Sequence, residues 1–326
     1  MTGPVTEERA AAPRAAFAPP GAPVEVAAVV VTHRSAGRVG ALLDSLRAEA
    51  AGLALRVVVV DNGSDDGTLD LVRAAYPDVV PLARGNLGYA GGINAAASHL
   101  GPCRAVLVLN PDLVVRPGAV AALLARLDAA RAGVVVPRIE DEAGRPAPSL
   151  RREPALAAAL VDAVAGSRWR AGRPAWSTET VLEASAYATA HPVDWATGAA
   201  LLVDEGLADA LGPWDERYFL YSEETEYCRR VRACGARVWF EPAATVVHAQ
   251  GGSGASPRLA ALLAVNRVRY VRAHHGRAYA AAFHGAVLLG EALRARGPGG
   301  PGHRAALRAL LAPRTWPALA APGASS

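Results

Sequence analysis

Short, continuous runs of apolar and β-branched residues alternate with segments of helical periodicity over the first third of this chain. The runs are Val26–Thr32, Leu55–Val60, Val79–Leu82 and Ala105–Leu109. Strands without polar alternation are typical of a parallel sheet that is covered on both faces. The segments between them are long enough to be crossover helices. We therefore predict an α/β fold with a Rossmann-like, mostly parallel, doubly wound sheet.

Length and composition suggest a folded protein of one large or two modest domains. The chain has 326 residues, 52% of them hydrophobic and 20% charged, which excludes wholesale disorder and coiled coil. We predict a disordered leader over residues 1–23, an α/β domain over 24–256, and a helical region with a disordered tail over 257–326. Residues 140–191 are poor in strand patterns, and we expect an insertion or an acceptor-side segment there.

Charge and targeting signals favour a soluble cytoplasmic protein. The formal net charge is only +4, too small for the basic footprint of a nucleic-acid-binding protein. The N-terminus lacks the apolar stretch of a signal peptide. No uninterrupted apolar run approaches the ~18 residues of a spanning helix. Three cysteines without CxxC spacing favour a reducing compartment.

Polar residues stand at the carboxyl ends of the predicted strands, where open α/β sheets bind their ligands. Thr32 and Asp61 end the first two strands. The loop that starts at Asp61 combines carboxylates, glycines and hydroxyls, and suits the base and ribose of a nucleotide. The alternative is a well-capped loop in which Asp66 or Thr68 is a helix N-cap.

A glycine-rich segment, Arg84–Asn94, follows the third predicted strand. Its four glycines precede a helix and allow close backbone approach to a phosphate. The segment is not a P-loop, because the chain contains no lysine.

Candidate metal ligands occur at two strand ends. Asp112 closely follows the strand that ends at Leu109 and could bind a divalent cation, since Mg²⁺ and Mn²⁺ prefer hard oxygen ligands. His248 follows a later strand, Val238–Val247, and could add an imidazole. The alternatives are a turn-forming Asn-Pro-Asp and a structural histidine.

Three carboxylates cluster at Glu223, Glu224 and Glu226, with aromatic residues on both sides. A helix that begins near Ser222 would place the first two in its first turn, where the helix dipole favours anions. One of them could be a general base. The alternative is an ordinary helix N-terminus with Glu226 paired to Arg229 or Arg230.

Seven segments in order resemble the family 2 glycosyltransferases, and among them the bacterial rhamnosyltransferase-like branch. They are VVVTHR, VVVVDNGSDDGT, NLGYAGGIN, LVLNPD, WATGAALLV, GPWDERYFLYSEETEYCRR and HAQGGS. The resemblance covers residues 26–253. It implies a GT-A catalytic domain, a nucleotide-diphosphate sugar donor, a divalent cation, and inversion at the anomeric carbon.

The resemblance also implies roles for individual residues. Contacts to the nucleotide sugar would come from Thr32, Asp61, Arg84, Asn86, Gly88, Gly91, Gly92, Asn94 and Asn110. Asp112 and His248 would be the metal ligands, with Gly251 and Ser253 in the same histidine motif. Glu223 and Glu224 match the family's Glu-Asp pair, whose second member is the catalytic base. Trp195, Gly198, Trp214 and Asp215 would shape the donor and acceptor pocket.

Two departures from the family pattern bear on the chemistry. Glu224 stands where the family usually has Asp, so the base would lie one methylene farther from its backbone, and the neighbouring Glu223 is the alternative base. The first strand is followed by Thr32-His33-Arg34, which lacks the Asn common at this place and weakens the base-recognition assignment.

We therefore expect an inverting glycosyltransferase that uses Mg²⁺ or Mn²⁺ and takes L-rhamnose from dTDP-L-rhamnose to a glycan, a lipid-linked or a small-molecule acceptor. The alternatives are a nucleotidyltransferase and a non-catalytic relative that binds a nucleotide sugar or a polysaccharide. Residues 258–314 interleave Arg with apolar residues at helical spacing. They could lie on the inner face of the plasma membrane, or pack on the catalytic domain with Arg outward.

Overall fold

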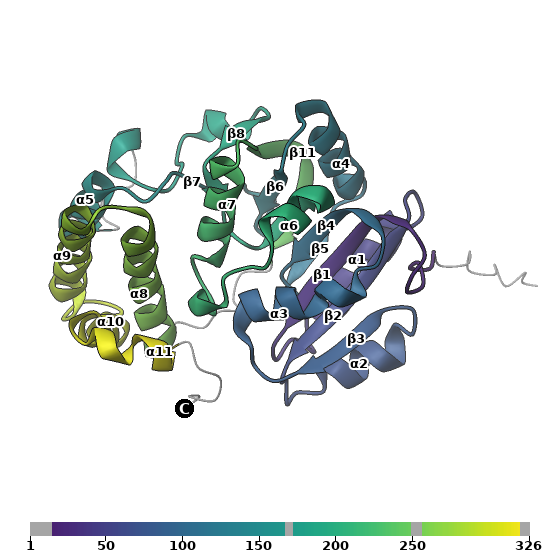
Figure 1. Cartoon of the computed structure of the whole chain (residues 1–326), viewed down its shortest axis with the longest axis horizontal. Helices are drawn as coiled ribbons and strands as arrows, with labels where there is room; N and C mark the ends of the chain where they lie inside the picture. The colour runs from purple at the N-terminus through teal and green to yellow at the C-terminus, as the bar shows by residue number, and fades with distance from the viewer. Residues whose placement is uncertain (1–14, 167–171, 249–255, 320–326) are drawn as a thin grey trace, which may run out of the picture.

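A computed structural model describes residues 15–166, 172–248 and 256–319 (Figure 1). The strands are β1 (Val24–Thr32), β2 (Leu55–Asn62), β3 (Val80–Arg84), β4 (Cys103–Leu109), β5 (Leu113–Val115), β6 (Val134–Glu140), β7 (Leu150–Arg151), β8 (His191–Val193), β9 (Trp195–Ala196), β10 (Ala200–Asp204) and β11 (Val238–His248). The α-helices are α1 (Val39–Glu49), α2 (Thr68–Ala75), α3 (Gly88–Ala96), α4 (Ala119–Ala130), α5 (Leu156–Ala165), α6 (Glu205–Leu211), α7 (Glu223–Ala233), α8 (Pro257–His274), α9 (Arg277–Arg294), α10 (Gly300–Leu311) and α11 (Trp316–Leu319).

The main sheet has the order β3-β2-β1-β4-β10-β6-β11-β5, with β8 paired to β11. Strands β1 to β4 are mutually parallel where they pair, and β10 is antiparallel to both of its neighbours. Because β1 and β2 run in parallel register, Thr32 lies opposite Asp61 at their carboxyl ends. The pairing of β11 shifts between Glu241 and Thr245, so this strand contains a bulge beside Glu241-Pro242. The predicted α/β fold is confirmed.

Helices cover both faces of the sheet because the strands are apolar on both sides. Val26, Ala28 and Val30 of β1 belong to a core that includes α1, α2 and α4. Val29 and Val31 belong to a second core that includes α3 and α7. All five residues are at most 6% exposed. The carboxyl ends of the parallel strands therefore remain as the open edge for a ligand.

The C-terminal helices form a separate layer of packing. α8, α9 and α10 share a core with Ala159 of α5 and with Trp316 of α11, and Figure 1 shows this group on the left, away from the parallel strands. The predicted helical C-terminal extension is confirmed. Helix α5 comes from the segment expected to be an insertion, and its sequence gave no sign that it would join this group.

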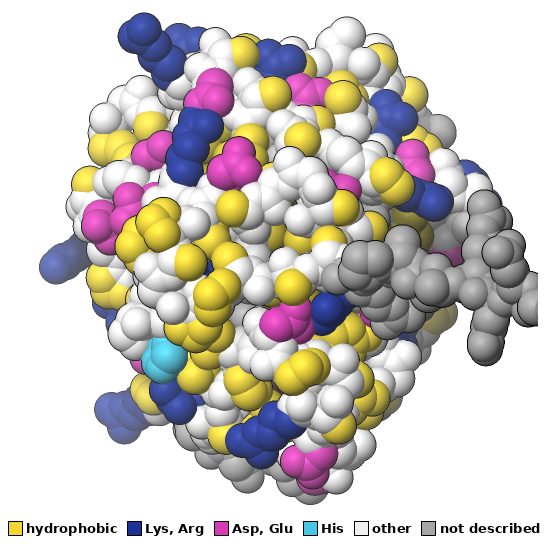
Figure 2. Space-filling view, turned by 90° about the vertical axis from the view of Figure 1, so that its right-hand side faces the viewer, with side chains coloured by type: hydrophobic (Ala, Val, Ile, Leu, Met, Phe, Trp, Pro, Cys, Tyr) yellow, Lys and Arg dark blue, Asp and Glu magenta, His cyan; other side chains and the backbone are white. Residues whose placement is uncertain are grey.

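Part of the segment predicted to be a leader contacts the sheet domain. Phe17 is buried, its amide donates to Asp78 at 2.9 Å, and the Arg47 guanidinium stacks over its ring. Within the described ranges, no helix is both long enough and apolar enough to cross a membrane. At the end of the molecule shown in Figure 2, acidic and basic side chains are interspersed among hydrophobic ones.

Candidate active site

The nucleotide side of the candidate site is built at the ends of β1 and β2. The Thr32 hydroxyl donates to one Asp61 oxygen at 2.8 Å, and the Ser64 amide donates to the other at 2.9 Å. The Asp61 carboxylate therefore holds the loop that follows it. The N-cap of α2 is Gly67, so the expectation of Asp66 or Thr68 at that position is wrong. The amide and hydroxyl of Thr68 both donate to Asp66, and these bonds lower the pKa of Asp66.

The glycine-rich segment runs into α3 at Gly88, so three of its four glycines lie within the helix and only Gly85 precedes it, contrary to the expectation of a loop. The Gly88 amide donates to Asn86 at 3.1 Å, and the Gly88 carbonyl accepts from Asn62 at 2.8 Å. Gly88 has φ +74°, and a Cβ there would lie 2.5 Å from the ring of Phe219. Only glycine fits this position, because both the backbone angle and the close approach exclude a side chain.

The other residues of this segment pack against the protein. A Cβ on Gly91 would lie 2.7 Å from Leu87, and one on Gly92 would lie 2.6 Å from Val31. Gly92 thus lets α3 lie close to the sheet, whereas Gly91 leaves room for Leu87 at the start of the same helix. Arg84 is exposed and donates to the carbonyl of Ala83.

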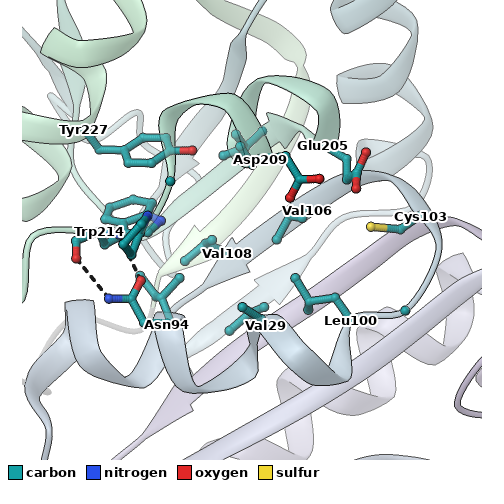
Figure 3. A pocket seen from close by; sticks show the side chains of 17 residues that line it. Val29, Asn94, Leu100, Cys103, Val106, Val108, Glu205, Asp209, Trp214 and Tyr227 are labelled. Atoms are coloured by element: carbon teal, nitrogen blue, oxygen red, sulfur yellow. Dashed lines mark hydrogen bonds between the residues drawn. The ribbon is translucent and has the colours of Figure 1, made fainter.

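Asn94 and Trp214 line a cavity of about 330 Å³ (Figure 3), and Asp215 follows Trp214 in the chain. Asn94 exchanges two hydrogen bonds of 2.9 Å with the backbone of Trp214. The Trp214 ring stacks on Tyr227 with centroids 4.2 Å apart. Asp215 is paired with Arg217 at 2.7 Å. The cavity walls come from α3, α6, β4 and neighbouring strands, and they include neither the candidate metal ligands nor the carboxylate pair.

The candidate metal ligands are brought together by β11 and the turn after β4. His248 Nε2 lies 3.1 Å from Asp112 Oδ1, and Arg38 lies 3.6 Å from the other Asp112 oxygen. Asp112 Oδ1 is buried and makes no hydrogen bond. A buried carboxylate oxygen of this kind beside an imidazole fits a divalent cation that takes its remaining ligands from a diphosphate and water.

No third acidic, histidine or cysteine side chain joins this pair in the part of the chain that the structure describes. Gly251 and Ser253, which resemble the rest of the family's histidine motif, lie outside the described residues. Asn110, two residues before Asp112, is half-buried. Its backbone N–H donates to the carbonyl of Ala199 at 2.8 Å.

The two candidate base residues occupy the first turn of α7, as predicted. Glu223 is 2% exposed, and its Oε2 has no hydrogen-bond partner. Burial and the neighbouring Glu224 raise the pKa of Glu223 well above its ordinary value. Burial also raises the pKa of Glu224, while the Gly198 amide and the Arg151 charge oppose that rise.

Gly198 and Tyr89 connect the carboxylate pair to the glycine-rich segment. A Cβ on Gly198 would lie 3.5 Å from Glu224 Cβ, and the Gly198 carbonyl accepts from the Tyr89 hydroxyl at 2.8 Å. Burial raises the pKa of Tyr89, and the charges of Glu223, Glu224 and Asp112 raise it further. Carboxylates from the turn after β4 and from α7 thus lie within electrostatic range of one phenol.

The remaining predicted residues have framework roles. Glu226 pairs with Arg230 at 2.9 Å, so the ordinary-helix alternative is correct for this third carboxylate. The Trp195 indole donates to the carbonyl of Arg152 at 2.9 Å and fixes the small β7-β9 sheet. That sheet carries Arg151, whose charge acts on Glu224.

Comparison with known proteins identifies the family. The family model described as "Glycosyl transferase family 2" matches residues 27–170. An N-acetylglucosaminyl-diphospho-decaprenol L-rhamnosyltransferase of Mycobacterium tuberculosis is 34% identical over 233 residues, which cover 66% of this chain and 73% of that protein. The chain belongs to glycosyl transferase family 2. It is a glycosyltransferase of the rhamnosyltransferase-like type.

Solved structures confirm the GT-A fold of this family 2 glycosyltransferase. GalNAc-T7 with UDP, GalNAc and Mn²⁺ has a TM-score of 0.55 at 16% identity, and the match covers 76% of this chain and 48% of that one. The mannosyltransferase PcManGT of Pyrobaculum calidifontis, in complex with GDP-Man and Mn²⁺, has a TM-score of 0.51 at 18% identity, with 93% and 86% covered. The comparisons favour glycosyl transfer over the nucleotidyltransferase alternative.

Sequence reasoning missed Tyr89 and Arg151 in this glycosyltransferase. Tyr89 is the aromatic residue of the glycine-rich segment, and its position between Gly88 and Gly91 was a usable signal. Arg151 lies in a segment without a recognisable motif, about 70 residues before α7. Only the pairing of β7 with β9 brings it near Glu224.

Proposed function

We propose that this glycosyltransferase moves L-rhamnose from dTDP-L-rhamnose to a hydroxyl of a lipid-linked acceptor, with inversion at the anomeric carbon. The observation that carries the proposal is the buried, unbonded Asp112 Oδ1 that lies 3.1 Å from His248 Nε2, a candidate cation site for a nucleotide diphosphate. The 34% identity to a mycobacterial L-rhamnosyltransferase supports the sugar, and the diphospho-decaprenol in that protein's name supports the acceptor class.

The donor would lie along the carboxyl ends of the parallel strands. Thr32 and Asp61 hold the loop that would face the nucleoside. The glycine-rich segment would lie beside the diphosphate, while its Gly88 and Tyr89 amides donate within the protein, to Asn86 and to the Phe219 carbonyl. Asp112 and His248 would hold Mg²⁺ or Mn²⁺, and this ion would neutralise charge on the diphosphate as it leaves.

Glu224 is the better candidate for the base. It is more exposed than Glu223, and the Gly198 amide and the Arg151 charge favour its ionised form. Glu223 has no such support, so it holds its proton more readily. Glu224 would take the proton of the acceptor hydroxyl while that oxygen attacks the anomeric carbon from the face opposite the diphosphate.

Replacement of the base tests the mechanism directly. Glu224→Gln should retain donor binding while turnover falls by about a hundredfold or more, the usual range for a lost general base. Transfer and hydrolysis of dTDP-L-rhamnose can be followed by release of dTDP, with exposed Glu142→Gln as the control. Undiminished turnover in Glu224→Gln would remove this residue from the base role. An inactive wild-type protein that binds donor would favour the non-catalytic alternative.

Donor and metal selection can be read from thermal stability. A ligand that binds only the folded state raises the melting temperature by mass action. We expect a larger increase with dTDP than with UDP or GDP, and we expect it to require Mg²⁺ or Mn²⁺. Asp112→Asn should abolish the metal-dependent part. A preference for UDP or GDP would overturn the proposed donor, and an equal shift without metal would overturn the metal site.

The same proposal places the protein against the inner face of the plasma membrane, through the outer surface formed by α5 and α9. This α5-α9 surface exposes large apolar side chains, with Leu160 45%, Val164 76%, Leu289 44% and Leu293 59% exposed. The two helices are tightly packed, since a Cβ on Gly290 would lie 3.1 Å from Ala163. They form the left-hand edge of the molecule in Figure 1.

Charge on α9 fits an anionic lipid surface. The exposed positions between Arg277 and Arg296 are occupied only by Ala, Gly and Leu. Glu291, the acidic residue of α9, is paired with His303 at 2.8 Å and lies 3.6 Å from Arg294. An apolar face with arginines at its ends is typical of helices that lie in the membrane interface.

A further inference from the structure

The segment that leads into the catalytic helix has an unusual backbone. Phe219, Tyr221 and Ser222 have φ values of +63°, +70° and +70°. The Leu220 amide donates to the Tyr218 carbonyl at 2.7 Å, which closes a γ-turn of the rare positive-φ type at Phe219. Non-glycine residues adopt these angles only when the surrounding structure holds them there.

One buried amide from the C-terminal helices holds this segment. Asn266 of α8 is fully buried, and its Nδ2 donates to the carbonyls of Tyr218, Leu220 and Tyr221 at 2.7, 2.9 and 3.0 Å. Two N–H groups are thus shared among three acceptors. Arg269 donates to Asn266 Oδ1 at 2.7 Å, which fixes the orientation of the amide.

The held segment contacts both halves of the candidate site. Its C-terminal end continues into Glu223 and Glu224, the first two residues of α7. At its start, the Phe219 carbonyl accepts from the Tyr89 amide at 2.6 Å, and the Phe219 ring fills the space beside Gly88. The position of this segment therefore sets where the carboxylate pair lies relative to the glycine-rich turn.

We propose that Asn266 is a positioning residue for catalysis: it holds residues 218–222 in their strained conformation, and so fixes Glu224 relative to the donor. This inference rests on the proposed role of Glu224. It gives the C-terminal helices a part in turnover that is separate from any membrane contact.

Asn266→Asp tests the proposal, because it retains the oxygen that accepts from Arg269 and removes the amide donor. We expect kcat to fall about tenfold or more, since small displacements of reacting groups are costly. Hydrogen exchange of the amides in residues 219–226 should accelerate. The matched control is Leu310→Ala, which opens the same helical core at a fully buried residue of α10. It should lower thermal stability without changing kcat.

A second variant separates positioning from simple stability. Ser222→Gly relieves one positive-φ residue, so it should restore part of the lost kcat when combined with Asn266→Asp. Equal kcat in Asn266→Asp and Leu310→Ala at a temperature where both are folded would overturn the proposal. So would an Asn266→Asp, Ser222→Gly double variant that does not fold or shows no recovery. An inactive wild-type protein would instead contradict the proposed function. Hydrogen exchange of the amides in residues 219–226 would still show whether Asn266 holds the segment.

Discussion

At the residue scale, the proposed mechanism depends on a difference between two adjacent carboxylates. Glu223 is almost fully buried, whereas Glu224 is more accessible and lies under the influence of Gly198 and Arg151. A carboxylate whose charge is stabilised less holds its proton to higher pH. The pair can therefore share one proton, and Glu224 is the member whose charge is better supported. In the proposed mechanism, the longer side chain of Glu224 is accommodated because its methylenes lie along Gly198.

Removing the buried charge should stabilise the protein in a pH-dependent way. The folded-state pKa of Glu223 is raised, so the native state is destabilised as pH rises from the ordinary carboxyl pKa through that raised value. Without metal or nucleotide, Glu223→Gln should therefore gain on the order of 1–3 kcal/mol near pH 8, the usual cost of a buried unpaired polar group. The gain should disappear near pH 4. Urea unfolding at several pH values measures it.

The control for this prediction is Glu142→Gln, at an exposed position. Its free energy of unfolding should follow that of the wild type at every pH. If the curves of Glu223→Gln and the wild type run parallel from pH 4 to pH 8, the buried carboxyl is not responsible for the pH dependence.

The pH dependence of kcat should also reflect the raised pKa of the carboxylate pair. A base works only when it is ionised, so kcat should fall as pH decreases through the raised pKa of the carboxylate pair. We expect the acid limb above the ordinary glutamate value of about 4.3. The measurement is kcat at saturating donor, metal and acceptor across pH 4 to 9. An acid limb at the ordinary value would contradict the assignment.

At the element scale, the glycine-rich turn and α7 act together because they touch through Phe219. The N-terminal turn of α3 fits there only since Gly88 has no side chain. The result is a direct backbone hydrogen bond between Tyr89 and Phe219, two segments about 130 residues apart in the chain. In the proposed mechanism, this contact would couple donor binding to the placement of Glu224.

Gly88→Ala should break this coupling. The added Cβ meets the Phe219 ring, so we expect at least a tenfold rise in donor KM or fall in kcat, together with a loss of stability. Gly118→Ala is the matched control: Gly118 has φ +80° and open space around its Cβ position. It should lower the free energy of unfolding by only about 1–2 kcal/mol, the strain of a non-glycine residue at positive φ, and leave kcat and KM unchanged. Equal kinetics in both variants would show that the contact with Phe219 is dispensable.

At the scale of the whole molecule, the two ends differ in surface chemistry. The end shown in Figure 2 carries mixed charges. The α5-α9 surface exposes leucine and valine side chains between arginines. Docking through that surface would direct the protein toward lipid-linked acceptors without a spanning helix.

Vesicle binding tests this surface. The double variant Val164→Glu, Leu293→Glu should lose most cosedimentation with phosphatidylglycerol vesicles, because it places charge in the apolar face. Wild-type binding should weaken with added salt and with uncharged phosphatidylcholine. Leu311→Glu is the control, since this residue is 67% exposed on α10, outside the α5-α9 surface. Wild-type protein that stays in the supernatant with anionic vesicles would contradict the docking proposal.

The sequence by itself determined the elements and the places where polar residues stand. Strand ends at Thr32 and Asp61, the glycine-rich start of α3, and the helix that begins at Glu223 all follow from local periodicity and composition. Local patterns decide these features because neighbouring residues in the chain create them. The order of the seven segments was also sufficient to indicate the family.

The tertiary structure alone decided which residues act on one another. Asn266 donates to carbonyls of a loop more than 40 residues before it. A short strand pair brings the charge of Arg151 near Glu224. Helix α5 packs with the C-terminal helices and not with the elements next to it in the chain. These contacts depend on the path of the whole chain, and no local pattern records that path. Burial, which separates Glu223 from Glu224, likewise exists only after the surrounding elements have packed.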